Sequence, residues 1–249
     1  MKALLRRLPG FRYLVLLRML LQGGVQRHTA VSLILRPRNL FQPFTTTSAG
    51  RYPEEFAAMR AALAEVEPDR LRILSFGCAS GEEVVDLLAE FPRAQVTGID
   101  LNPLALRAAR RNVRAAGGQD RVTLVRAGDV RAQPSESYDA VLAFAVLRHG
   151  ELNHAPATCA PKLRFADFED TVTDLCRTVR PGGLFAIRHS NFRFTDCAVA
   201  VDFEPVRVGF ESFSEQGRTP VYGREDELLD VSARDDGIYR RLPTGRAGR

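Results

Sequence analysis

The chain has 249 residues, of which 45% are hydrophobic, so it is long and apolar enough for one ordinary domain with its own core, and wholesale disorder is excluded. Its net charge of +5 comes almost entirely from arginine, and it permits but does not indicate binding to nucleic acid or an acidic membrane surface. The four cysteines form no CxxC pair and no zinc-type cluster, which favours a reduced, cytoplasmic protein without a metal site.

The first residues combine basic side chains with an apolar run, as a signal peptide does. Arg12 and Arg18 interrupt that run and no small-residue cleavage site follows, which argues against a signal peptide. The run is also too short and too charged to span a bilayer. We therefore expect residues 1–56 to form an amphipathic helical cap on the main domain. We consider membrane contact by this segment unlikely, and it is the minor alternative.

From residue 52 the hydrophobic pattern alternates between helical and strand periodicity. The pattern predicts helices at 52–66, 81–91, 102–118 and 168–183 and strands at 71–76, 94–100, 121–129, 138–147 and 184–190, with weaker strand signals at 202–210 and 237–242. Such alternation is typical of an α/β domain whose parallel sheet is covered on both faces. We expect residues 57–249 to form a Rossmann-like, seven-stranded, mostly parallel sheet.

The stretch "SFGCASGEE" (75–83) joins the first predicted strand to the next helix, where open parallel sheets bind their ligands. A dinucleotide site places a glycine where this chain has Glu82, whose carboxylate would repel a pyrophosphate. No Gly-Lys-Ser/Thr follows, which excludes a P-loop. The turn therefore predicts a ligand that is not anionic at this end. Ser80 and Glu83 also fit a helix capping box, so capping alone is the alternative role of the acids.

An acid ends the second predicted strand, in "VTGIDLNP". Asp100 lies 23 residues after Gly77, and an acid at this place in the nucleotide-binding scheme accepts hydrogen bonds from both ribose hydroxyls. A lone aspartate at a strand end can also serve only as a helix cap. Combined with the turn, the spacing favours a ligand with a nucleoside half and a cationic half.

The small residues Gly77, Ala79 and Gly81 and the "GIDLNP" stretch resemble the class I S-adenosylmethionine-dependent methyltransferases. The form "GCASGEE" is similar to the glutamate methyltransferases of chemotaxis receptors. The resemblance covers roughly residues 70–190 and includes "RAGDV" and "CRTVRPGG". Two positions depart from the family pattern: Ser75 replaces an acid at the end of the first strand, and Ala79 replaces the middle glycine.

The resemblance implies S-adenosyl-L-methionine as cofactor and assigns Asp100 to the ribose and Asp129 to the adenine amino group. The residues that it places at the cofactor are Ser75, Gly77, Cys78, Ala79, Gly81, Asp100, Leu101, Asp129, Val130 and Phe144. His149 follows the fourth strand and His189 the fifth, at the edge that faces the ligand cleft in this fold. Either can act as a catalytic base, and the alternative is a histidine without a role.

The acceptor of the methyl group is constrained mainly by missing motifs. The motif for methylation of base amino groups is absent, since "AFAV" (143–146) occupies its place, and no Pro-Cys suits pyrimidine carbon methylation. Nucleic acid is therefore an unlikely partner. We expect transfer to an oxygen or nitrogen of a small molecule. The alternatives are a protein carboxyl methyltransferase, in which Arg148, Arg188 and Arg193 clamp a carboxylate, and a non-catalytic S-adenosylmethionine-binding subunit.

Aromatic residues gather before the first predicted strand, at Phe41, Phe44, Tyr52 and Phe56. Aromatic side chains in a loop can line a pocket and exclude water, which methyl transfer favours. We expect this segment to close over the acceptor pocket. The alternative is that the aromatics only cover an apolar edge or face of the domain.

Overall fold

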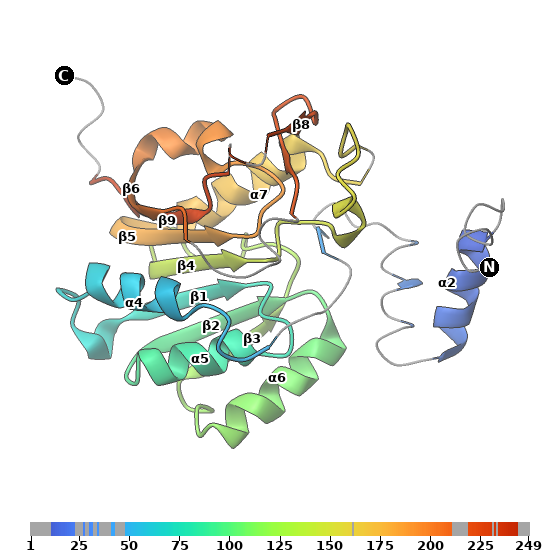
Figure 1. Cartoon of the computed structure of the whole chain (residues 1–249). Helices are drawn as coiled ribbons and strands as arrows, with labels where there is room; N and C mark the ends of the chain where they lie inside the picture. The colour runs from blue at the N-terminus through green and yellow to red at the C-terminus, as the bar shows by residue number, and fades with distance from the viewer. Residues whose placement is uncertain are drawn as a thin grey trace.

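A seven-stranded sheet forms the centre of the protein in the computed structural model (Figure 1). The structure describes residues 11–22, 27, 30–31, 34, 41–42, 48–160, 162–210, 219–230, 232 and 234–243. Its strands are β1 (Arg72–Phe76), β2 (Gln95–Asp100), β3 (Val122–Arg126), β4 (Tyr138–Phe144), β5 (Val179–Arg188), β6 (Phe203–Val208) and β9 (Gly237–Arg241).

The strand order is β3-β2-β1-β4-β5-β9-β6. Strands β1 to β5 pair in parallel, and β9 inserts antiparallel between β5 and β6. The strand order reverses at β1, because β2 and β3 lie on one side of it and β4 and β5 on the other. The carboxyl ends of β1, β2 and β4 therefore meet at one edge of the sheet, where ligands bind in open α/β sheets. The predicted Rossmann-like, mostly parallel fold is confirmed.

Helices cover both faces of the sheet because its central strands are apolar on both sides. The helices are α2 (Phe11–Gln22), α4 (Pro53–Ala62), α5 (Glu82–Glu90), α6 (Pro103–Ala115) and α7 (Phe165–Thr178). On one face of the sheet, residues of α4, α5 and α6 pack in one core cluster with alternate residues of the strands. On the other face, residues of α7 pack in a second cluster with the remaining strand residues. The arginines of α6 point to solvent, as its helical spacing predicts.

The predicted helix at 168–183 differs from the structure at both ends. Helix α7 begins at Phe165 and ends at Thr178, and β5 starts directly at Val179. The carbonyls at the end of α7 accept the N–H groups of Glu136 and Ser137, which draws the chain into pairing with β4 before Pro181. Pro181 thus lies inside β5, where the pairing register with β4 shifts. The short hairpin of β7 (Val221–Tyr222) and β8 (Leu228–Leu229) had no predicted counterpart.

The segment before β1 contributes to the core of the domain. Tyr52 and Phe56 are buried, and the Tyr52 ring lies 4.5 Å from that of Phe144 between centroids. Phe41 is buried in the cluster on the α7 face, whereas Phe44 lies outside the described residues. Residues 1–10 and most of 23–47 also lie outside them, so the cap over 1–56 and its boundary stay predictions.

A buried ion pair joins this segment to the end of β5. The guanidinium of Arg188, at the end of β5, is fully buried, and its Nε lies 2.6 Å from Oε1 of Glu55 on α4. Its Nη1 lies 3.9 Å from Oδ2 of Asp236, just before β9. Arginine does not deprotonate in proteins, so this buried charge requires its carboxylate partners.

Neutralising Glu55 tests the importance of this pair. Glu55→Gln removes one of the carboxylates that neutralise the buried charge of Arg188, and we expect it to lower the free energy of unfolding by about 3–5 kcal/mol. Glu54→Gln is the matched control, because Glu54 pairs with Arg207 across the surface at 3.4 Å and exposed pairs contribute little. Urea denaturation measures both variants. Equal effects of the two substitutions would contradict this role of the buried pair.

Candidate active site

The turn after β1 is held in an unusual backbone conformation. Gly77, Ala79 and Gly81 have φ angles of +78°, +47° and +85°, in the left-handed region that glycine tolerates best. The N–H groups of Gly77 and Cys78 both donate to the carbonyl of Ile99, at 2.8 and 3.0 Å. The turn is therefore anchored to the end of β2.

Glycine is required at both ends of this turn for steric reasons as well. A Cβ atom on Gly77 would lie 2.4 Å from the Val146 side chain, and one on Gly81 would lie 2.9 Å from Ala109 of α6. Gly182 has the same φ as Gly77 but has nothing within 4 Å of that position. The turn glycines thus allow close approach of α6 and of the segment after β4.

Asp100 at the end of β2 is bonded to this turn. Its Oδ2 accepts the N–H of Ala79 at 2.9 Å, and its Oδ1 accepts that of Asn102 at 2.7 Å. A carboxylate can accept about four hydrogen bonds, so it can bind backbone donors and hydroxyl groups at the same time. The helix cap at this place is Asn102, whose side chain accepts the N–H groups of Leu104 and Ala105. Asp100 is thus not the cap of α6.

The two acids of the turn are arranged differently from a capping box. Gly81 is the N-cap of α5 and makes no side-chain cap, while Ser80 donates to Glu82 at 2.8 Å. The predicted capping box is therefore wrong. Glu83 instead accepts a hydrogen bond from the buried Ser75 hydroxyl at 2.7 Å. Glu83 thereby brings a carboxyl group to the end of β1, where the chain has Ser75 in place of an acid.

The carboxyl group of Glu83 is poised near neutral pH. Desolvation on burial raises its pKa to about 7, against smaller lowering contributions from the Ser75 hydrogen bond and the charge of Arg51. Cys78 beside it is buried, and burial raises the pKa of its thiol well above the usual value. Cys78 is therefore a neutral packing residue of the turn, and an ionised Glu83 adds negative charge there.

The predicted adenine contact lies beyond β3. Oδ1 of Asp129 accepts the N–H of Arg131 at 3.1 Å, and Val130 is buried beside it. Together with Phe76 and residues of α7 they line a shallow hollow of about 110 Å³. Leu101 is half-buried directly after Asp100. The structure thus places these residues at the ends of β2 and β3, on the edge of the sheet that carries the turn.

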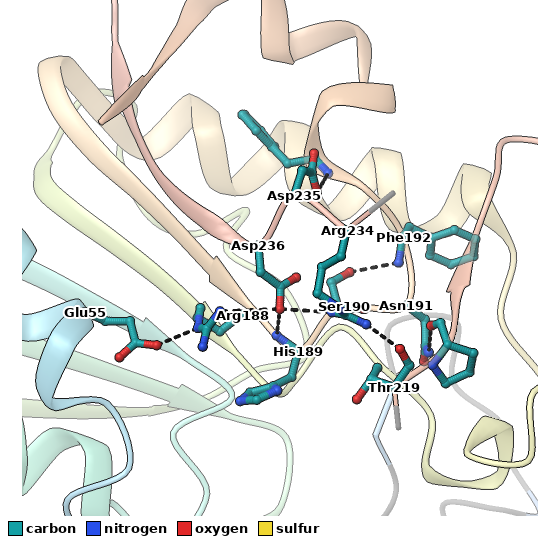
Figure 2. Close-up of polar contacts among 12 residues, drawn as sticks. Glu55, Arg188, His189, Ser190, Asn191, Phe192, Thr219, Arg234, Asp235 and Asp236 are labelled. Carbon is teal, nitrogen blue, oxygen red and sulfur yellow. Dashed lines mark hydrogen bonds and ion pairs between the residues drawn. The ribbon is translucent and has the colours of Figure 1, made fainter. Parts of the chain in front are cut away.

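His189 is held rigidly at the end of β5. Figure 2 shows the carboxylate of Asp236 beside Arg188, Arg234 and the His189 backbone; its Oδ2 accepts the His189 N–H at 2.6 Å and Nη1 of Arg234 at 3.0 Å. This contact holds His189 at a φ of +53°, which is strained for a residue with a side chain. Burial, followed by the charges of Arg188, Arg51 and other arginines, lowers the pKa of His189 to about 3, so its imidazole is neutral at pH 7.

The rings of Tyr52 and Phe144 form an aromatic wall on one side of the imidazole of His189. The Tyr52 ring lies 5.9 Å from it and 4.5 Å from the ring of Phe144 at the end of β4. Two polar atoms in this wall, Oη of Tyr52 and Nδ1 of His189, are buried without a hydrogen-bond partner among the described residues. Buried polar atoms are costly when they are left unpaired, and a ligand with hydrogen-bonding groups can pair with them.

His149 has a different environment. Its imidazole Nδ1 accepts the backbone N–H of Glu151 at 3.2 Å and thereby caps a short 3-10 helix. Its backbone N–H donates to Oδ1 of Asn191 at 2.7 Å. These contacts are those of a structural turn residue. The catalytic role predicted for His149 and His189 stays a prediction, and the geometry favours His189.

A glycine-containing turn after β1, an acid at the end of β2 and a mostly parallel sheet define a Rossmann-like nucleotide-binding domain. Residues 74–185 match the family described as "Methyltransferase domain". Residues 74–185 thus form a methyltransferase domain of the class I S-adenosylmethionine-dependent type. The predictions of this family and of S-adenosylmethionine as cofactor are thereby confirmed.

Curated relatives share part of the chain. The ribosomal RNA small subunit methyltransferase C of Hahella chejuensis is 28% identical over 66% of this chain and 44% of its own length. The trans-aconitate 2-methyltransferase of Streptomyces avermitilis is 31% identical over 41% of this chain and 39% of its own. The release factor glutamine methyltransferase of Rhodospirillum rubrum is 38% identical over 36% of this chain and 27% of its own length. The chain spans less than half the length of these relatives, whose names describe three different acceptors.

Among solved structures, a methyltransferase from Geobacter sulfurreducens in complex with S-adenosyl-L-homocysteine matches 57% of this chain and 50% of its own, with 24% identity and a TM-score of 0.40.

The groups at the turn fit a cationic nucleoside cofactor. The side chains of Glu82, Glu83 and Asp100 offer acceptors, which suit ribose hydroxyls and positive charge, whereas a pyrophosphate would meet repulsion. Asp100 would hold the ribose, Glu83 and the turn the cationic end, and Asp129 the adenine edge.

The sequence interpretation missed three contributors to this site. Tyr52 was one of several aromatics without an individual role, and for Glu83 a capping box was the alternative to a place in the ligand-binding turn. Asp236 follows no motif, and it reaches His189 only because β9 returns beside β5. The one local signal for such a partner was Arg188, an arginine that directly follows the apolar run 184–187.

The raised pKa of Glu83 predicts a pH-dependent stability. In the folded state Glu83 keeps its proton up to about pH 7, whereas the unfolded chain loses it near pH 4.5, so this contribution to stability is complete below about pH 4.5 and is lost as the pH rises to 7. Glu83→Gln removes the free-energy cost of ionising a buried carboxyl group in the folded state. We therefore expect the variant to be more stable than the original protein at about pH 8 by on the order of 1–3 kcal/mol, with a smaller difference at about pH 5.

Thermal unfolding across this range, without cofactor, measures the difference. Ser75→Ala is the companion variant: it removes a hydrogen bond that lowers the pKa of Glu83, so the pH-dependent loss should move to higher pH. A Glu83→Gln effect that is constant from pH 5 to 8 would contradict the raised pKa.

Proposed function

We propose that the protein transfers a methyl group from S-adenosylmethionine to an oxygen or nitrogen of a small molecule, and that the acceptor binds against Tyr52 and His189. The observation that carries this proposal is the pair of buried atoms without partners, Oη of Tyr52 and Nδ1 of His189, in an aromatic wall beside Phe144. An acceptor hydroxyl or amino group has the hydrogen-bonding capacity that these two atoms lack in the described structure.

Bound S-adenosylmethionine supplies a methyl group activated by a sulfonium. The chain has to align the acceptor and exclude water. Tyr52 and Phe144 exclude water through their rings. His189 is neutral at pH 7 because its pKa lies at about 3, so its unprotonated nitrogen can accept a hydrogen bond from the acceptor's hydroxyl or amine. A base of such low pKa orients the acceptor and does not store its proton, so we assign His189 a positioning role.

The arginines bear on the alternative of a carboxyl acceptor. Arg193 forms two bonds of 2.7 Å to the carboxylate of Asp196, and Arg188 pairs with Glu55. Two of the three arginines expected to clamp an acidic substrate are thus engaged with the chain's own acids. This engagement supports the small-molecule acceptor over a protein carboxyl group. The names of the curated relatives include RNA and protein acceptors, so these remain outcomes of the acceptor test.

Cofactor binding depends on Asp100 in this proposal. Asp100→Ala removes charge-assisted hydrogen bonds to the ribose, each of about 1.5–3 kcal/mol, and we expect the affinity for S-adenosylmethionine to fall at least roughly 10- to 100-fold. Asp129→Ala should weaken binding less. Asp120→Ala, in an exposed loop, is the control. Calorimetry measures the affinities, circular dichroism checks the fold, and an unchanged affinity in Asp100→Ala would refute the assignment.

The acceptor site is tested with labelled cofactor. Methyl transfer into a whole-cell extract, followed by identification of the product, names the acceptor class. We expect Tyr52→Phe and His189→Asn to lower kcat/KM by about 10-fold or more, because each removes one contact to the acceptor, while the cofactor affinity stays unchanged. His154→Asn, at an exposed histidine, should have no effect.

The product decides between the acceptors. A labelled small molecule supports the proposal, and a labelled protein or RNA overturns it. Cofactor binding without transfer to any component of the extract would indicate a non-catalytic subunit instead.

A further inference from the structure

Charge is divided unevenly along the chain. Nine of the 35 basic residues lie in residues 1–53, which contain none of the 30 acidic residues. Residues 54–249 therefore hold 26 basic and 30 acidic residues, a net charge of −4. The overall charge of +5 hides a leading segment of +9 ahead of a weakly acidic domain. Such asymmetry indicates attraction to an anionic surface.

Helix α2, inside this basic segment, exposes a large apolar face. Leu14, Leu17 and Leu21 are 66%, 53% and 79% exposed and follow helical spacing, and Tyr13 beside them is 75% exposed. Arg18 is exposed next to this stripe. In Figure 1 the helix stands to one side, away from the sheet. Single exposed leucines are ordinary, but a contiguous stripe of them marks an interaction surface.

We propose that α2 docks on an anionic phospholipid surface and lies in its plane. A bilayer of this kind offers both features that the segment matches: an apolar layer for Leu14, Leu17 and Leu21, and negative headgroups for the surrounding arginines. The helix has 12 residues and is about 18 Å long, too short for a hydrocarbon layer of about 30 Å. Among the described helices none is long and apolar enough to cross a membrane.

Two other occupants explain the observations less well. A nucleic acid would pair with the arginines but would leave the exposed leucines in water, since phosphates attract only the charge. A second copy of the chain would cover the leucines but would bring two segments of +9 together, which is repulsive. The bilayer surface satisfies the apolar stripe and the charge at once. This inference does not depend on the identity of the methyl acceptor.

Vesicle flotation of the full chain tests the proposal. We expect binding to phosphatidylcholine vesicles that contain phosphatidylglycerol to be at least about tenfold stronger than binding to phosphatidylcholine alone, and to weaken in high salt. Leu14→Ser, Leu17→Ser and Leu21→Ser combined should abolish it. Val201→Ser, Val206→Ser and Val208→Ser combined, which remove exposed apolar side chains elsewhere, should not.

A charge reversal tests whether vesicle binding depends on the arginine of α2 or only on the net positive charge of the protein. Arg18→Glu should lower vesicle binding several-fold, whereas Arg107→Glu, at an exposed arginine of α6, should leave it unchanged. Circular dichroism checks that each variant is folded. Equal binding to neutral and anionic vesicles, equal loss in both arginine variants, or no vesicle binding would overturn the proposal. Sedimentation without lipid tests for a dimer. A dimer that the triple leucine substitution dissociates would also overturn the proposal.

Discussion

The buried guanidinium of Arg188 is the constraint on which the arrangement of the site depends. A charge that cannot be lost must be neutralised where it lies, and the two carboxylates that do so come from opposite ends of the domain, Glu55 before β1 and Asp236 before β9. Asp236 also accepts the backbone N–H of His189. The ion pairs of Arg188 therefore position α4, the start of β9 and the strained backbone of His189.

The two halves of the site differ in charge, and this difference separates their ligands. The turn after β1 carries acids, with Asp100 bonded to the turn and Glu83 to Ser75, and the charge of Arg51 lowers the pKa of Glu83. Around His189 the charges that lower its pKa are arginines, Arg188 foremost after burial itself. A cationic cofactor is drawn to the first half and repelled by the second, which agrees with the proposed acceptor position beside His189.

The sequence predicted most of the fold, because helical and strand periodicity report burial directly and β4 is buried along its whole length. The end of α7 was placed too late, since the pairing of β4 with β5 ended the helix before Pro181 did. Local motifs located the turn and Asp100. They did not place Tyr52 and Asp236, whose roles arise from contacts between segments distant in sequence.

The pairing of Glu55 with Arg188 has a consequence for the order of folding. The two residues are 133 positions apart, so during synthesis α4 leaves the ribosome long before its partner charge exists. Strands β1, β2 and β3, which make the cofactor half, follow one another closely and can pair early, because closing short loops costs less entropy. The wall formed by Tyr52 and His189 is completed only after β5 and β9 have been made. A nascent chain therefore forms the half with the turn and Asp100 first, and the contact between Tyr52 and His189, where we propose that the acceptor binds, is completed last.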